Sequence, residues 1–415
     1  MAVINPATVT GVINPATASA VIDLAAYQRN LRTFATLVGD AKVMAVVKAD
    51  GYGHGMFACA RAARQAGIDW LGVATPGEAL ALRADEDTGR VLCWLYGIDE
   101  DLTELVAAEV DVTVSSTEQL GRVVAAAATS ELRAAVHLKI DTGLSRNGAT
   151  AQEWPELCSR AAEAEQAGAI DVVGIWSHLA AADQPGHPSV KHQSGRFADA
   201  VAQARTAGLA PQLLHLANSA GALVVPAARH DLVRIGIAGY GIDPGTDVAD
   251  RAGVRLDPVM TLRAQLAAVR PLAAGESVSY GHTWTAAAPT TVALVPLGYA
   301  DGIPRHASNL AEVYLVAERR RVPVRGRICM DQFVVDLGAE TSAQVGDEVI
   351  VFGAPPPAAD SQEDRERSVS PPTAQEWAQV CGAIGSEIVT RLGVRVPGVY
   401  RIEDDQQGQD RRGNR

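Results

Sequence analysis

The feature that most constrains the fold is an alternation, from about residue 20 onward, of apolar runs with alanine-rich stretches of helical character. The apolar runs are VMAVVKA, WLGVA, VLCWLYG, DVTVSS, AVHLKID, VVGIWSHL, LLHLAN and VRIGIAGYG. Buried strands that alternate with helices form a parallel sheet covered on both faces. Eight such units over roughly 230 residues predict a (β/α)8 barrel, a TIM-type fold. A doubly wound sheet is the alternative, but no GxGxxG follows the first run.

The pattern changes after about residue 250, where strand-like runs follow one another with turn residues and few helices between them. We therefore predict an extended leader with a VINPAT repeat at 1–19, a barrel at 20–252, a β domain at 253–402 and a disordered tail at 403–415. Inside the β domain, the Pro- and charge-rich segment 354–373 is a predicted mobile loop, and a helix is expected from about 374 to 391.

Composition narrows the classes of protein to consider. A chain of 415 residues is too long for one ordinary core, and a net charge of -12 argues against nucleic acid or anionic membranes as partners. The five cysteines form no CxxC pair, which argues against a zinc site and favours a reducing compartment. No apolar run approaches the roughly 20 residues of a membrane span, and no signal peptide is recognisable. These features predict a cytoplasmic protein.

Barrel active sites lie at the carboxyl ends of the strands, so the residues there are the first candidates. Lys48 ends the first apolar run, and Lys139 lies within AVHLKID. A desolvated lysine has a lowered pKa and forms Schiff bases with carbonyl compounds, including pyridoxal phosphate. The alternative for Lys48 is a surface lysine whose stem covers a strand end. Lys139, inside an apolar strand, must be paired or modified if it is buried.

The other candidates have equally ordinary explanations when each is taken alone. The glycines of VRIGIAGYG, with Ser219, suit either a phosphate site or tight turns. His178 could be either a catalytic residue or a histidine of the core. Arg146 and Arg234 could each be either a binding-site residue or a solvated surface charge. In the β domain, Tyr280 and the pair Met330 and Asp331 are equally plain.

Taken together and in order, these segments resemble the alanine racemase family. The similar segments are AVVKADGYGHG, HLKIDTGLSRNG, WSHLAAAD, HLANSAG, VRIGIAGYGI, SYGHTW, VPLGYADGIPR and GRICMDQF, and the resemblance covers roughly residues 20–400. It implies a cytoplasmic isomerase, dependent on pyridoxal 5'-phosphate, that makes D-alanine for peptidoglycan precursors. It also implies a barrel followed by a β domain and a head-to-tail homodimer with shared active sites, with no metal.

The resemblance also implies a role for each candidate. Lys48 is the Schiff-base lysine and one catalytic base, and Tyr280 of the partner subunit is the opposing base. Arg146 contacts the cofactor and lies near the substrate. His178 connects that tyrosine to Arg234, which contacts the cofactor. The remaining implied positions are Tyr52, Asn218, Ser219, Gly236 and Ile237 for holding the cofactor, Met330 and Asp331 for the substrate end, and Lys139 as a carbamate.

Two bases on opposite faces of an α-carbon can remove a proton from one face and return it on the other. The reference pKa of a phenol is about 10, so Tyr280 needs a charged network to act as a base, and a chain of His178 and Arg234 supplies one. Arg234 facing the pyridine nitrogen would keep that nitrogen unprotonated.

One position departs from the family pattern. In GAIGSEIVTRLG the family usually carries a phenol where this chain has Ser386. The hypothesis is a looser pocket that admits amino acids larger than alanine, such as serine, or holds the cofactor more weakly. Two further alternatives remain. A barrel-type amino-acid decarboxylase needs a cysteine motif near the chain end, a context that Cys381 lacks, and a cofactor carrier would lack the β domain.

Overall fold

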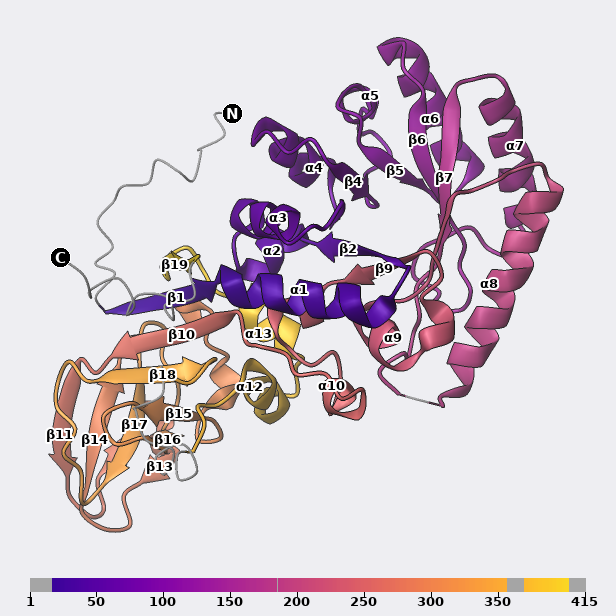
Figure 1. Cartoon of the computed structure of the whole chain (residues 1–415). Coiled ribbons are helices and arrows are strands. Elements are labelled where there is room, and N and C mark those ends of the chain that lie inside the picture. The colour runs from indigo at the N-terminus through magenta and orange to yellow at the C-terminus, as the bar shows by residue number, and fades with distance from the viewer. Residues whose placement is uncertain (1–16, 185, 357–368, 403–415) are drawn as a thin grey trace, which may run out of the picture. The chain divides into compact units, whose positions relative to one another are not determined.

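The computed structural model describes residues 17–184, 186–356 and 369–402. The described chain divides into two compact units (Figure 1). One runs from Leu24 to Asp257, and the other combines Pro258–Ile402 with the residues up to Asp23. The repeat-bearing part of the predicted leader, most of the predicted loop 354–373 and the predicted tail lie outside the described residues.

The first unit contains eight parallel strands in the order β8-β7-β6-β5-β4-β3-β2-β9. The strands are β2 (Lys42–Val46), β3 (Trp70–Val73), β4 (Arg90–Cys93), β5 (Asp111–Val114), β6 (Ala134–Lys139), β7 (Ile170–Trp176), β8 (Leu213–His215) and β9 (Leu232–Ile235). The backbone N–H of Arg234 donates to the carbonyl of Ala217 at 3.1 Å, which joins the two end strands. The sheet is therefore a nearly closed barrel, and all eight predicted strands are confirmed.

Helices alternate with these strands, and α7 and α8 lie on the outer side of the sheet in Figure 1. The helices are α1 (Leu24–Val38), α2 (Lys48–Gly53), α3 (Met56–Gln65), α4 (Pro76–Ala84), α5 (Thr103–Ala107), α6 (Thr117–Ser130), α7 (Trp154–Gln166), α8 (Pro188–Thr206), α9 (Ser219–Val224) and α10 (Val248–Arg251). Local sequence sets their starts. Thr75 and Glu78 form a capping box at α4, and the Ser116 side chain caps α6. No helix of the described residues is both long and apolar enough to cross a membrane.

The second unit is built on a nine-stranded sheet in the order β11-β14-β17-β16-β15-β18-β10-β1-β19. Its strands are β1 (Ala18–Asp23), β10 (Met260–Gln265), β11 (Ala268–Leu272), β14 (Thr290–Val295), β15 (Glu312–Leu315), β16 (Arg320–Arg325), β17 (Phe333–Gly338), β18 (Glu348–Phe352) and β19 (Gly398–Arg401). A short hairpin of β12 (Ser277–Val278) and β13 (Trp284–Thr285) and the helices α12 (Ala374–Cys381) and α13 (Gly385–Thr390) complete it. The predicted β character of this part is confirmed.

The unit boundaries differ from the predicted ranges because β1 pairs with strands far away in the chain. Ile22 is opposite Met260 in an antiparallel pair and opposite Tyr400 in a parallel pair. The segment 18–23, which the sequence analysis divided between leader and barrel, therefore belongs to the β sheet. The helix expected at 374–391 is also two helices, because Gly382 ends α12 in a left-handed conformation with φ 66°.

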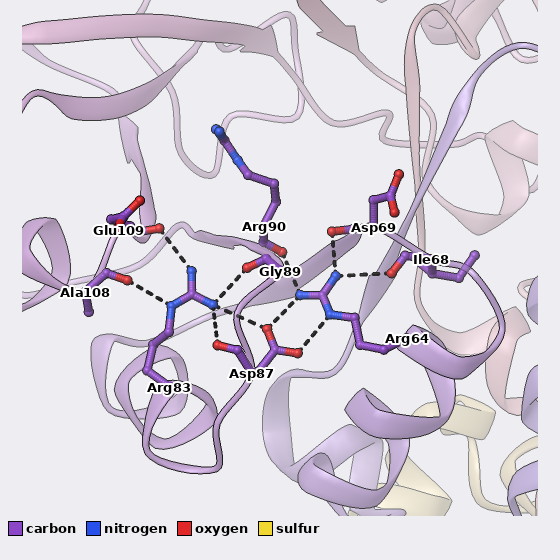
Figure 2. Close-up of polar contacts among 9 residues, drawn as sticks. All are labelled: Arg64, Ile68, Asp69, Arg83, Asp87, Gly89, Arg90, Ala108 and Glu109. Atoms are coloured by element: carbon purple, nitrogen blue, oxygen red, sulfur yellow. Dashed lines mark hydrogen bonds and ion pairs between the residues drawn. The ribbon is translucent and has the colours of Figure 1, made fainter.

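A clamp of Arg64, Arg83 and Asp87 ties together the loops before β3, β4 and β5 (Figure 2). The Asp87 carboxylate accepts two bonds from Arg64, each of 2.8 Å, and one from Arg83. The remaining guanidinium donors are taken by backbone carbonyls, including those of Ile68 and Ala108. Each nitrogen of both guanidinium groups thus has an acceptor in the protein, so the clamp fixes the end of the barrel where the strands begin.

We expect Asp87→Ala to destabilise the barrel by about 3 kcal/mol, because it leaves two half-buried guanidinium groups without their carboxylate. For a unit of this size the thermal midpoint should fall by roughly 6–12 °C. The matched control is Asp85→Ala, which removes the partner of the more exposed Arg61 and should change stability by at most about 1 kcal/mol. Equal thermal shifts in the two variants would contradict the clamp.

Candidate active site

Lys48 is followed by a left-handed turn. The next four residues, Ala49 to Tyr52, have φ between 52° and 60°. This conformation costs an L-residue about 1–2 kcal/mol, and only Gly51 adopts it freely. Two side chains hold the turn: Glu78 accepts from the Ala49 N–H at 2.7 Å, and Asp50 accepts from the Met56 N–H at 2.8 Å. The strained backbone is thus fastened directly after the candidate lysine, as expected at a functional site.

A cavity of about 520 Å³ lies at the carboxyl ends of the barrel strands. Its size is typical of a small-molecule site. All ten candidates that the sequence analysis placed in the barrel line it: Lys48, Tyr52, Lys139, Arg146, His178, Asn218, Ser219, Arg234, Gly236 and Ile237. Residues from distant parts of the barrel segment therefore meet in one place.

Burial and, after it, the positive charge of the cavity lower the pKa of both lysines. Burial is the main cause for Lys48, and the Arg146 guanidinium adds to it. Burial, then Arg234 and Arg146, lower the pKa of Lys139 to about 8. Each amine therefore has a larger neutral, nucleophilic fraction near neutral pH than an ordinary lysine.

Arg234 holds the neighbouring imidazole of His178 in one state. The Nη2 group of Arg234 donates to Nδ1 of His178 at 3.2 Å. Burial, followed by the Arg234 charge, lowers the pKa of His178 to about 2, so the ring is neutral at physiological pH. Because Nδ1 accepts, the proton of the neutral ring is on Nε2, which is available to donate.

The other end of the cavity offers hydroxyl groups and close backbone. Burial raises the pKa of Tyr52 to about 12, so its hydroxyl keeps its proton. A Cβ atom at Gly236 would lie 2.5 Å from that hydroxyl oxygen, so only glycine fits there. The Ser219 hydroxyl accepts from the Gly236 N–H at 3.0 Å. Hydroxyl and N–H donors grouped in this way suit an anionic group such as a phosphate.

The three β-domain candidates lie on the second unit, at exposed positions. Tyr280 is 68% exposed and Met330 52% exposed. Tyr280 is flanked by Ser279 with φ 64° and Gly281 with φ 71°. The Ser279 hydroxyl donates to the Arg327 carbonyl at 2.6 Å, which fixes this turn. Asp331 forms an ion pair with Arg395 at 2.7 Å.

Sequence reasoning missed the two tryptophans beside the lysines. The Lys139 amine is 4.2 Å from the centre of the Trp176 ring, and the Lys48 amine is 5.9 Å from that of Trp94. Aromatic faces stabilise cations that have left water. Each tryptophan lies inside an apolar run, so its pattern was indistinguishable from core. In the structure Trp94 directly follows β4 and Trp176 ends β7, and a place at a strand end is the signal that could have identified them.

The fold and the cavity together define a barrel enzyme whose site holds a buried and a half-buried lysine and is suited to an anionic carbonyl compound held through a lysine. The chain belongs to the alanine racemase family. Residues 22–244 match the family's N-terminal domain and residues 259–400 its C-terminal domain.

Similar proteins agree along nearly the whole chain. The alanine racemase of Frankia casuarinae is 49% identical over 378 residues, which cover 91% of this chain and 94% of that one. The solved alanine racemase of Streptomyces coelicolor is 47% identical, with a TM-score of 0.86 over 94% of this chain and 99% of that one. That from the D-cycloserine producer Streptomyces lavendulae is 44% identical, also with a TM-score of 0.86, over 94% and 98%.

Proposed function

We propose that the chain interconverts L- and D-alanine, with pyridoxal 5'-phosphate as cofactor and as a homodimer with shared active sites. The observation that carries the proposal is the Lys48 amine, depressed in pKa and placed in a cationic cavity of cofactor size. A relative at 49% identity is an alanine racemase, and the Bacillus anthracis alanine racemase, 28% identical with a TM-score of 0.80, has been solved with bound L-Ala-P.

The lining residues fit pyridoxal phosphate. Lys48 would bond covalently to it, Tyr52 and Ser219 would donate to its phosphate with the backbone of Gly236 and Ile237, and Asn218 supports this segment by capping α9. When bound, the cofactor supplies an electron sink that acidifies the α-proton of the amino acid. The close approach at Gly236 keeps this end of the cavity clear of a side chain.

Lys48 and Tyr280 of the partner subunit would be the two bases. The neutral fraction of the Lys48 amine takes the α-proton from one face, and the phenol or phenolate exchanges a proton on the other. The neutral His178 ring would donate its Nε2 proton to that phenolate, while its Nδ1 accepts from Arg234. Met330 and Asp331 of the partner subunit would line the substrate end, with Arg146 opposite the substrate carboxylate.

Two cations of the cavity have further roles. Arg234 would donate to the pyridine nitrogen, and because a guanidinium retains its proton, that nitrogen stays unprotonated and the electron sink is moderate.

Lys139 would carry a carbamate: its neutral amine adds carbon dioxide and releases a proton. The low pKa of this amine favours that addition. The resulting negative charge would face Arg146 and Arg234, the two cations that add to the effect of burial in lowering the pKa of the free amine.

We expect purified protein in deuterated water to racemise L-alanine with incorporation of deuterium at the α-carbon. Lys48→Ala should abolish exchange, because no base remains on that face. Tyr280→Phe should slow exchange for one enantiomer by about 10²- to 10⁴-fold and leave the other enantiomer exchanging. Nuclear magnetic resonance of the α-proton measures the exchange, and optical rotation measures the racemisation.

The matched control is Lys42→Ala, which removes a lysine from the start of the same strand, β2, and should leave turnover unchanged. Release of carbon dioxide from the substrate would contradict the racemase proposal in favour of a decarboxylase. A bound cofactor without turnover would instead indicate a carrier. Equal loss of exchange for both enantiomers in Tyr280→Phe would rule out the two-base assignment.

Ser386 favours a wider substrate range than alanine alone. Ser386 lies in the first turn of α13, directly after Gly385. A small side chain therefore occupies the position where the family usually carries a phenol ring, and its neighbour adds no bulk. We expect the wild type to turn over serine as well as alanine, and Ser386→Tyr to raise the ratio of alanine to serine turnover. Paired kcat/KM values for the two amino acids measure this. An unchanged ratio would remove the loose-pocket hypothesis, and Ser386→Ala, which adds no bulk, is the control.

A further inference from the structure

A line of hydrogen bonds runs through the barrel interior from the candidate site to the opposite end. Nη1 of Arg234 donates to Nδ1 of His215 at 3.2 Å, and Nε2 of His215 lies 2.9 Å from Nδ1 of His137. Nε2 of His137 lies 3.0 Å from Oδ2 of Asp111. That carboxylate also pairs with Arg90, whose side chain is 46% exposed. One line thus connects a buried guanidinium to a carboxylate at the far end of the strands.

The chemistry of the two ends gives the line a single direction. Arg234 can only donate, so Nδ1 of His215 must accept and its proton must be on Nε2. The Nε2–H group of His215 therefore donates to Nδ1 of His137. The proton of His137 is then on Nε2, which donates to Asp111. A carboxylate can only accept, so each group is satisfied with both imidazoles neutral. Burial and the neighbouring His137 and Arg234 lower the pKa of His215 well below its ordinary value, in agreement with a neutral ring.

The buried Arg234 charge needs compensation. Its side chain is almost completely buried, and its other hydrogen-bond partners are the backbone carbonyls of Ser177, His215 and Leu216 and the neutral His178. Among the residues that the structure describes, no carboxylate pairs with it directly. A buried charge is costly unless it is paired or well hydrogen-bonded. The line of hydrogen bonds that begins at Arg234 passes through the two histidines and ends on the carboxylate of Asp111.

Two backbone features make room for this line. A Cβ atom at Gly174 of β7 would lie 2.6 Å from Nδ1 of His137, so a side chain there would displace the imidazole. The register between β6 and β7 also shifts between Val136 and His137, where one strand has an extra residue. Bulges of this kind redirect side chains next to active sites. A glycine inside a strand likewise marks a place of close approach. Both features seat His137 against His215.

We propose that Asp111 is a positioning residue for the active site: through His137 and His215 its carboxylate fixes the tautomers of both rings, so that Nδ1 of His215 accepts from the buried Arg234. This goes beyond the proposed function and rests on it only for the role of Arg234. The variant that tests it is Asp111→Asn, which keeps the shape but adds an NH2 donor. An amide can donate to Nε2 of His137, so the line can reverse and place a proton on Nδ1 of His215, against the Arg234 donor.

The experiment uses the full chain loaded with pyridoxal phosphate and labelled with 15N-histidine. Long-range proton–nitrogen spectra report which ring nitrogens carry protons. In the wild type we expect His137 and His215 to be protonated on Nε2 only. In Asp111→Asn we expect an Nδ1-protonated population, together with a loss of about 2- to 30-fold in kcat/KM for alanine, the range for residues that act through a coupled network.

A matched variant separates this effect from loss of the surface ion pair. Arg90→Gln leaves Asp111 as a pure acceptor, so it should keep the wild-type tautomers and kcat/KM. If Asp111→Asn alone does not fold, the double variant Arg90→Gln with Asp111→Asn removes both charges together and should show the reversed line.

Protonation of Nδ1 in the wild type, unchanged spectra in Asp111→Asn, or changed spectra with unchanged kcat/KM would each overturn the proposal. The spectra need no turnover, so a wild type without racemase activity would refute the proposed function and leave the tautomer test intact.

Discussion

The candidate site depends on buried positive charge that no carboxylate of the described residues pairs with directly. Arg234 and Lys139 are 4% and 6% exposed. Their surroundings are backbone carbonyls, a neutral imidazole and the face of Trp176, which both cations approach. Such groups solvate a cation without neutralising it. Burial, together with neighbouring cations, lowers the pKa of each lysine and of His178, so each lysine amine has a larger neutral fraction and the His178 ring is neutral.

Holding this charge in place needs rigidity at both ends of the barrel. At the carboxyl ends, Glu78 and Asp50 fasten a strained left-handed turn directly after Lys48. At the opposite end, the Arg64, Arg83 and Asp87 clamp joins the loops, and Asp111 ends the line of imidazoles that begins at Arg234. The interior of the barrel therefore contains a line of hydrogen bonds as well as core packing, and this line joins the two ends.

Much of the barrel could be predicted because buried parallel strands are continuous apolar runs that need no distant partner to be recognised. The barrel residues that line the cavity could be named in advance because they lie near the ends of those runs and because the ordered motifs resemble one family, while their roles stay predictions. The strand 18–23 could not be placed, since its partners begin at Met260 and Gly398. The line from Asp111 to His215 was also hidden, because its members are 26 and 78 residues apart and meet only when the barrel closes.

A pH titration of the lysine side chains, labelled with 13C at the ε position, would measure the two shifted amines in the chain freed of cofactor and bicarbonate. The chain has only four lysines, at positions 42, 48, 139 and 191, so each resonance can be assigned by substitution. We expect the Lys139 amine to titrate near 8 and the Lys48 amine to titrate below the ordinary lysine value of about 10.4. Ordinary titration of both amines would contradict this expectation.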